Sequence, residues 1–271
     1  MKLRELNGIC LYIVESLPIG DMKTGSNLRD DLRQLWYDTK NEYFTCEIFS
    51  PYNIIDLENV MLQIKNQVVV ENKIPIIQIE CHGSSDGLMI SSHERIPWFS
   101  LFDMLRPINE SSHDLLMLHM SMCNGDAIIR AIDPQKRSPF RATIGHEGEA
   151  FPDDLIEKWL KLFSNYNKLF TEKNIGLHKL AIDCGFIYYT QEFIFDAHFD
   201  LANQDPELFE QLRMKEMYNM YKEDGPLAMH PEIYKKWVAQ KQARIKQKYR
   251  DNFCFTDILK ENLSIYLNQK E

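Results

Sequence analysis

The 271-residue chain is 44% hydrophobic and 26% charged, values of an ordinary globular protein that can bury one large domain, or a domain with an appendage. No apolar stretch approaches the roughly 20 residues that a membrane-spanning helix needs, and the first residues lack a signal peptide's long apolar segment, so we expect a cytoplasmic protein. The net charge of −9 argues against general binding to nucleic acid, and six scattered cysteines without a CxxC pair argue against a disulfide framework.

Two hydrophobic periodicities alternate over the first 150 residues. Short runs rich in β-forming residues predict strands at 9–16, 43–49, 74–80, 114–122 and 142–145. Strands and helices that alternate in this way form right-handed crossovers, so we expect an α/β fold with a mainly parallel sheet and helices on both faces. The helices are predicted by apolar residues three and four positions apart, namely Leu28, Leu32, Leu35 and Trp36; Ile54, Leu57, Met61, Ile64 and Val68; and Trp98, Leu101, Phe102 and Leu105.

The later elements are less regular. Pro107 is expected to end the third helix, and Pro152 suits the first position of a fourth. Residues 176–184 predict another helix and residues 186–195 a strand.

The character of the chain changes near residue 203, where charged helical stretches begin. We expect an α/β domain over 1–202 and a helical appendage, packed on it, over 203–271. Seven basic residues and no acidic one occupy 235–250. This pattern is typical of a solvated helix face, and a docking site for an acidic partner or nucleic acid is the alternative.

Two predicted strands end in residues that can carry chemistry. The run at 74–80 is followed by Cys81, His82 and Gly83, and the run at 114–122 is followed by Cys123. Ligands and chemistry in such sheets lie at the carboxyl ends of strands, which would place both segments at one edge. A histidine there can take the proton of a cysteine thiol and return it to a leaving group, so the pair predicts nucleophilic catalysis.

Other interpretations of these residues remain open. His82 could be an ordinary histidine in a turn, and Cys123 an ordinary buried cysteine. Cys81 should point to the opposite side of its strand from His82, toward the core. A zinc site from Cys81, His82 and Cys123 would need a fourth ligand, for which His113 and His119 are candidates only by residue type.

A family resemblance follows from the order of these segments. The stretch IPIIQIECHGSSDGLMI, then ERIPWFSLFDML, then LLMLHMSMCNGDA and ATIGHEGEAFPDDLIEKWLKLF resembles the caspase-like cysteine peptidases, and most closely the bacterial CHAT domains, over about residues 9–195. The resemblance implies a caspase-like three-layer sandwich and hydrolysis of peptide bonds without cofactor or metal. It implies Cys123 as nucleophile, His82 as acid and base, and the backbone N–H groups of Gly83 and Cys123 as the oxyanion hole. Met122 departs from the small residue that many relatives have before the cysteine.

Acidic residues lie close to the predicted pair in the sequence. In relatives that cleave after basic residues, acidic side chains of these loops shape the substrate pocket, which makes Asp86, Asp126, Asp153 and Asp154 candidates. His146, with Glu147 beside it, could line the same cleft. Helix capping or simple exposure to solvent is the alternative for each of them.

Three functions compete at this point. By resemblance, the first is limited cleavage of a specific protein partner, such as a gasdermin-like effector in bacterial antiviral defence, with a regulator binding at the C-terminal helices. The second is a catalytically inactive caspase-like module that recognises a partner protein. A flavodoxin-like nucleotide binder is the third, and the absence of GxGxxG and GxxxxGK[ST] motifs disfavours it.

Overall fold

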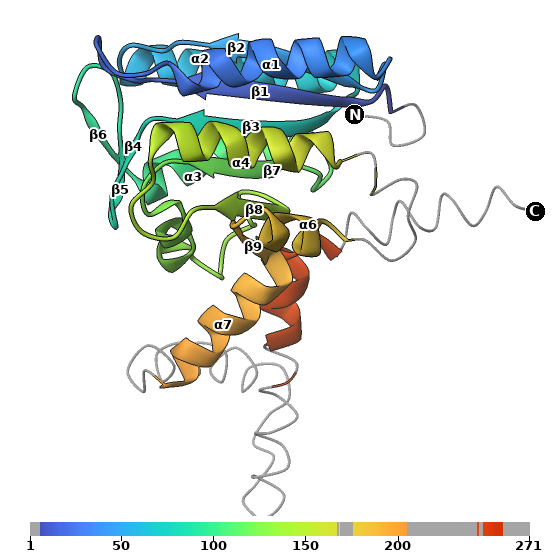
Figure 1. The fold of residues 1–271 in the computed structure, drawn as a ribbon. Helices are drawn as coiled ribbons and strands as arrows, with labels where there is room; N and C mark the ends of the chain where they lie inside the picture. The colour runs from blue at the N-terminus through green and yellow to red at the C-terminus, as the bar shows by residue number, and fades with distance from the viewer. Residues whose placement is uncertain (1–5, 167, 169–175, 205–242, 244–245, 257–271) are drawn as a thin grey trace, which may run out of the picture. The chain divides into compact units, whose positions relative to one another are not determined.

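A computed structural model describes residues 6–166, 168, 176–204, 243 and 246–256 (Figure 1). The chain divides into two compact units, one formed by 1–132 and 138–191 and the other by 133–137 and 192–271. The appendage predicted over 203–271 and the basic stretch 235–250 fall mostly outside the described residues. No helix in the described ranges is long and apolar enough to cross a membrane.

The first unit is built on a six-stranded sheet with the order β2-β1-β3-β7-β8-β9. The first five of these strands are parallel, and only the edge strand β9 runs antiparallel to its neighbour β8. The strands are β1 (Ile9–Glu15), β2 (Phe44–Phe49), β3 (Ile74–Glu80), β7 (Met117–Ser121), β8 (Ala142–Gly145) and β9 (Ile187–Thr190).

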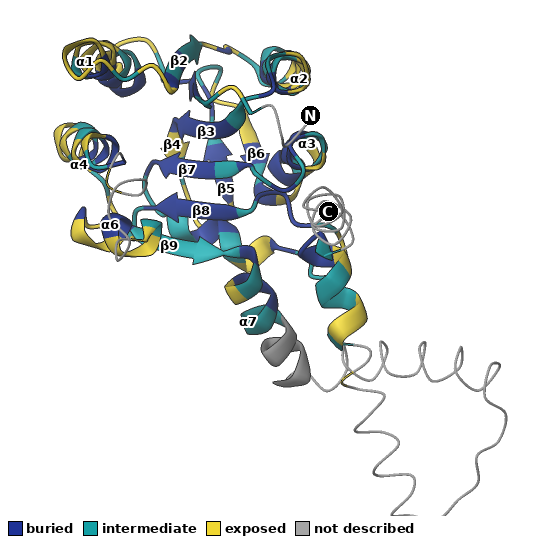
Figure 2. Ribbon diagram, turned by 90° about the vertical axis from the view of Figure 1, so that its right-hand side faces the viewer, coloured by how far each residue is buried: buried dark blue, intermediate teal, exposed yellow. Residues whose placement is uncertain are grey.

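Helices cover both faces of this sheet, as Figure 2 shows. One face carries α1 (Thr24–Asp38), α4 (Pro152–Ser164) and α6 (Leu177–Asp183), with α1 beside α4. The opposite face carries α2 (Ile54–Glu71) and α3 (Trp98–Ser111), which also pack side by side. The predicted α/β fold with a mainly parallel sheet between helices is therefore confirmed.

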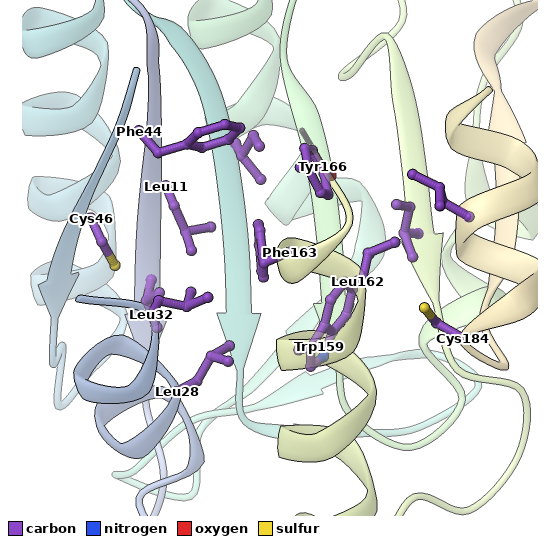
Figure 3. Packing of buried hydrophobic residues seen from close by; sticks show 14 of the residues in the cluster. Leu11, Leu28, Leu32, Phe44, Cys46, Trp159, Leu162, Phe163, Tyr166 and Cys184 are labelled. Atoms are coloured by element: carbon purple, nitrogen blue, oxygen red, sulfur yellow. The ribbon is translucent and has the colours of Figure 1, made fainter. Parts of the chain in front are cut away.

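The core under α1 and α4 combines aliphatic and aromatic side chains (Figure 3). Leu28 and Leu32 of α1 pack on the β1 side of the sheet, where Leu11 and Ile13 are fully buried. Trp159 of α4 stacks on Phe186, with 4.1 Å between ring centroids. This packing fixes α1 and α4, and with them the loops that precede the two helices, over the carboxyl edge of the sheet.

Two expectations for the later elements are wrong. Pro107 does not end α3, which continues to Ser111. Proline removes its own N–H donor and its ring crowds the carbonyl four residues earlier. The last turn is nevertheless held by Asn109, which is fully buried and donates to the Ser138 carbonyl and to Asp114, each at 3.1 Å.

The strand expected over 186–195 stops at Thr190, and α7 (Gln191–Gln204) begins at the next residue. Gln191 is fully buried and donates to Asp114 at 2.6 Å. Phe195, one helical turn further, packs on Phe253 within the second unit, at 5.6 Å between ring centroids. Gln191 and Phe195 are thus buried against different partners, and the single apolar run seen in the sequence is divided between a strand and a helix.

A small antiparallel sheet was not predicted. It consists of β4 (His82–Gly83), β5 (Gly87–Met89) and β6 (Arg95–Pro97) and follows directly after β3. His82 therefore begins a short strand and does not lie in a turn.

Candidate active site

The register of β3 and β7 brings His82 and Cys123 to the same edge of the sheet. Glu80 is paired with Ser121 at the last register position of the two parallel strands. Cys81 and His82 follow the one strand, as Met122 and Cys123 follow the other. The sulfur atoms of Cys81 and Met122 lie 4.0 Å apart. Because side chains alternate across a strand, His82 and Cys123 belong to the opposite face, which α1 and α4 cover.

Gly83 lies against the backbone of the cysteine. A Cβ atom on Gly83 would overlap the carbonyl oxygen of Cys123 and would lie 2.8 Å from Met122 Cγ. Only glycine allows the two chain segments to approach this closely. The segment after β3 and the segment after β7 are thus in direct contact, as the spacing of the two motifs predicted.

The His82 ring is oriented by a residue that the sequence analysis did not identify. Asp21, in the loop between β1 and α1, has its carboxylate oxygen Oδ2 2.8 Å from His82 Nε2. The carboxylate can only accept a hydrogen bond, so a neutral imidazole carries its proton on Nε2 and leaves the Nδ1 lone pair as the base. About half of the His82 side chain is exposed, at 49%.

The Cys123 sulfur is half-buried and faces the loop between β8 and α4. The backbone N–H of Ala150 donates to it at 3.3 Å, and no hydrogen bond joins it to the His82 ring. The next residue, Asn124, has φ of 53° and donates its N–H to the Gly148 carbonyl at 2.7 Å. The loop 146–150 therefore encloses the sulfur on one side.

The backbone N–H groups expected to form the oxyanion hole are those of Gly83 and Cys123. Ser84 donates to the Gly87 carbonyl at 2.9 Å, so the next pair along the β4–β5 hairpin, Gly83 with Leu88, is a pair without mutual hydrogen bonds. The Gly83 N–H consequently points away from β5. Among the described residues, the N–H of Cys123 donates to no acceptor either.

Two buried carboxyl groups lie beneath the edge where the pair sits. Glu15 and Glu80 are register partners at the ends of β1 and β3, and both are almost fully buried. Burial raises the pKa of Glu80 to about 7, and hydrogen bonds from Thr24 and Gln78 lower it only partly. Ser26 donates its N–H and its hydroxyl to Glu15 at 3.0 and 2.8 Å.

These contacts tie the start of α1 to the sheet. Gly25 packs so closely that a Cβ atom there would lie 2.9 Å from Glu80 Cγ. The loop that carries Asp21 is therefore anchored at its far end by residues 24–26.

The acidic residues predicted near the site are distributed differently. Asp86 is exposed at the tip of the β4–β5 hairpin, where its carboxylate accepts a hydrogen bond from the Ser85 hydroxyl at 3.1 Å. Asp153 and Asp154 occupy the exposed first turn of α4. Asp126, by contrast, has a side chain only 13% exposed, 3.9 Å from Arg130.

His146 belongs to the same edge as Cys123. Its carbonyl accepts a hydrogen bond from the N–H of Asp126 at 3.3 Å. Burial lowers its pKa, and so does Lys158, whose Nζ lies 3.3 Å from His146 Nε2, while Asp154 and Asp126 have a smaller, opposite effect. Asp126 and His146 thus lie close to the cysteine loop, and their role in a substrate pocket stays a prediction, as it does for Asp86.

Two of the residues considered as zinc ligands, Cys81 and His119, are buried. Cys81 is buried, and burial raises the pKa of its thiol. His119 is fully buried and stacked on Trp159 at 4.7 Å, and burial lowers its pKa to about 3. Within the described ranges, no cluster of three or more histidine, cysteine or acidic residues is arranged to hold a metal ion.

Comparison with known proteins gives no family for the chain. No model of a known protein family matches it, and no curated protein matches its sequence.

Proposed function

We propose that the chain is a cysteine peptidase of caspase-like type, with Cys123 as its nucleophile and His82 as its acid and base. The observation that supports this most is the close contact of Gly83 with the Cys123 backbone, because it brings the two strand ends together. The Asp21–His82 contact adds to the case, since it leaves the base on Nδ1. A thiol and an imidazole at the same edge of a sheet are the groups that nucleophilic catalysis at neutral pH can use.

The proposed reaction uses groups already described. His82 Nδ1 takes the thiol proton, and the Cys123 sulfur attacks the carbonyl carbon of the substrate peptide bond. The N–H groups of Gly83 and Cys123 donate hydrogen bonds to the oxyanion that forms. His82 then gives its proton to the departing amine, and water hydrolyses the thioester. Throughout, Asp21 stabilises the positive charge that His82 acquires.

The proposed substrate is a protein with one accessible cleavage site. The resemblance to CHAT domains suggests limited cleavage of a partner in bacterial antiviral defence, with gasdermin-like effectors as candidates. Asp126 and His146 are the predicted pocket residues nearest to the cysteine loop, so they are the first to vary when the preference at the cleavage site is measured.

The test is to map new protein N-termini after adding the full chain to a lysate of the organism that encodes it. Wild-type protein should create a reproducible set of new N-termini that Cys123→Ala abolishes. Cys184→Ala is the matched control, because it removes a buried thiol from the core while leaving the site intact. If Cys123→Ala creates the same N-termini as wild type, Cys123 is not the nucleophile.

A second candidate is a catalytically inactive module that binds a partner protein. The observation that favours it is the position of the Cys123 sulfur, which accepts from Ala150 and makes no hydrogen bond with His82. A peptide-based acylating probe separates the two functions. A peptidase labels at Cys123 and loses most labelling in His82→Ala, whereas an inactive module labels equally slowly in both proteins.

A further inference from the structure

Helix α2 has a second apolar stripe on the side that faces away from the sheet. Its core side is formed by Leu57, Met61, Ile64 and Val68, four of the five residues of the stripe that the sequence predicted. On the opposite side Ile55, Leu62 and Val69 are 64%, 55% and 48% exposed. Residues seven apart lie almost in line along a helix, so these three form one continuous apolar seam. Figure 2 shows exposed residues on the outer surface of α2.

Polar residues flank this seam in a regular order. Glu58 and Lys65 lie on one flank, and Asn59 and Asn66 lie on the other. Within the described part of the chain, neither Glu58 nor Lys65 has an ion-pair partner. The helix therefore presents two opposite charges, seven residues apart, beside an uncovered apolar line.

The arrangement of apolar, charged and amide side chains on this side of α2 matches itself when the helix direction is reversed about Leu62. Reversal exchanges Ile55 with Val69, Glu58 with Lys65, and Asn59 with Asn66, to within one residue. In an antiparallel helix pair, residues on the same flank face one another. Each Glu58 would thus face a Lys65, and each Asn59 an Asn66, across the pair.

We propose that α2 is an isologous interface on which a second copy of this chain docks its own α2, antiparallel and with a twofold axis at Leu62. The two seams pack Ile55 against Val69 of the second copy and the two Leu62 side chains against each other. Two Glu58–Lys65 pairs close one flank. A twofold axis requires such self-complementarity, whereas an unrelated partner would need a matching pattern of its own.

The size of the seam determines how strong this dimer is. One helix pair covers less than the about 800 Å² per partner of a standard stable interface. The dimer therefore forms reversibly, with dissociation in the micromolar range or weaker. It involves neither His82 nor Cys123, so it holds whether or not the chain is a peptidase.

Sedimentation equilibrium of the full chain at several concentrations tests the proposal. The average mass should rise from 32.0 kDa toward twice that value as concentration increases. Glu58→Lys and Lys65→Glu should each raise the dissociation constant about tenfold or more, since each creates two like-charge pairs. The double variant restores opposite charges and should return the constant to near the wild-type value.

Cross-linking tests the position of the axis. Leu62→Cys should form a disulfide-linked dimer under mild oxidation, because its sulfur meets its own symmetry mate. Gln63→Cys, also exposed but off the seam, is the matched control and should not. Wild-type protein reports any background from Cys123, the one half-buried native thiol in the described ranges.

Three results would overturn the proposal. The first is a chain that stays at 32.0 kDa up to millimolar concentration. A dimer that neither charge reversal weakens, or that the double reversal fails to restore, is the second. The third is a monomer whose seam instead captures a different protein, with the capture lost in Leu62→Glu. Circular dichroism of each variant verifies that these exposed substitutions leave the fold intact.

Discussion

Replacing Glu80 by glutamine should remove a pH dependence from the stability of the first unit. Burial raises the pKa of this carboxyl group to about 7, against 4.5 for the free side chain. The folded state therefore holds the proton more tightly than the unfolded state does, and the free energy of unfolding falls as pH rises from about 4.5 through about 7. The difference between the two values, at 1.36 kcal/mol per pH unit, corresponds to about 3 kcal/mol.

Urea unfolding at pH values from 4.5 to 8 measures this effect. As pH rises over this range, the free energy of unfolding of Glu80→Gln should increase by up to about 3 kcal/mol relative to that of wild type, because an amide stays neutral where the carboxyl group ionises. Thr24→Val is the matched variant of opposite sign. It deletes the Thr24 hydroxyl, which donates to Glu80 at 2.6 Å and thereby lowers the pKa of the Glu80 carboxyl group. Without it that pKa should rise further, so the free energy of unfolding should depend more strongly on pH. If the free energies of unfolding of wild type and Glu80→Gln change equally with pH, Glu80 does not bind its proton more tightly in the folded state.

Three further substitutions probe the site and the core beside it. Asp21→Asn should slow alkylation of Cys123 by iodoacetamide up to about tenfold. The free energy of unfolding should change little, since the contact between Asp21 and His82 is half-exposed. An unchanged alkylation rate would show that Asp21 has no part in the mechanism. Gly83→Ala should lower the free energy of unfolding, measured by urea titration, by about 1–3 kcal/mol and should reduce probe labelling of Cys123, because the added methyl group overlaps the Cys123 carbonyl. A variant as stable as wild type would contradict that close contact. His119→Phe should make the free energy of unfolding less dependent on pH in acid. Burial lowers the pKa of His119 to about 3, so wild type loses about 1.4 kcal/mol of unfolding free energy per pH unit below 6.5, and the variant does not. Melting temperatures that fall equally with pH in both proteins would refute this.

The regular elements of the first unit could be predicted because their apolar spacing is set by the same burial that the fold uses. Leu57, Met61, Ile64 and Val68 marked α2 in the sequence and are its buried residues in the structure. The failures have a common cause in tertiary contacts. Asn109 holds α3 together beyond Pro107, and Gln191 starts a helix inside an apolar run, each through hydrogen bonds to Asp114. No local pattern encodes those partners.

The site was predictable only in part for a similar reason. His82 and Gly83 lie shortly after the end of β3 and Cys123 shortly after the end of β7, so the strand ends and the parallel topology suffice to bring the two segments together. Asp21 lies six residues after β1 and contacts His82 because β1 is the neighbour of β3. That neighbour relation depends on the order of strands in the sheet, which alternation of strands and helices does not determine.

A signal for the buried carboxyl groups was nevertheless present in the strands. A parallel strand buried on both faces is expected to be apolar throughout, yet Gln78, Glu80, His119 and Ser121 interrupt β3 and β7 at alternate positions. Register pairs Gln78 with His119 and Glu80 with Ser121, so all four share the face that also carries His82 and Cys123. Buried polar groups cost stability unless they are hydrogen-bonded. Here the bonds of Glu80 to Thr24 fasten the start of α1, and the loop leading into α1 holds Asp21 against His82. Polar residues of the core thus secure the loop whose Asp21 contacts the histidine.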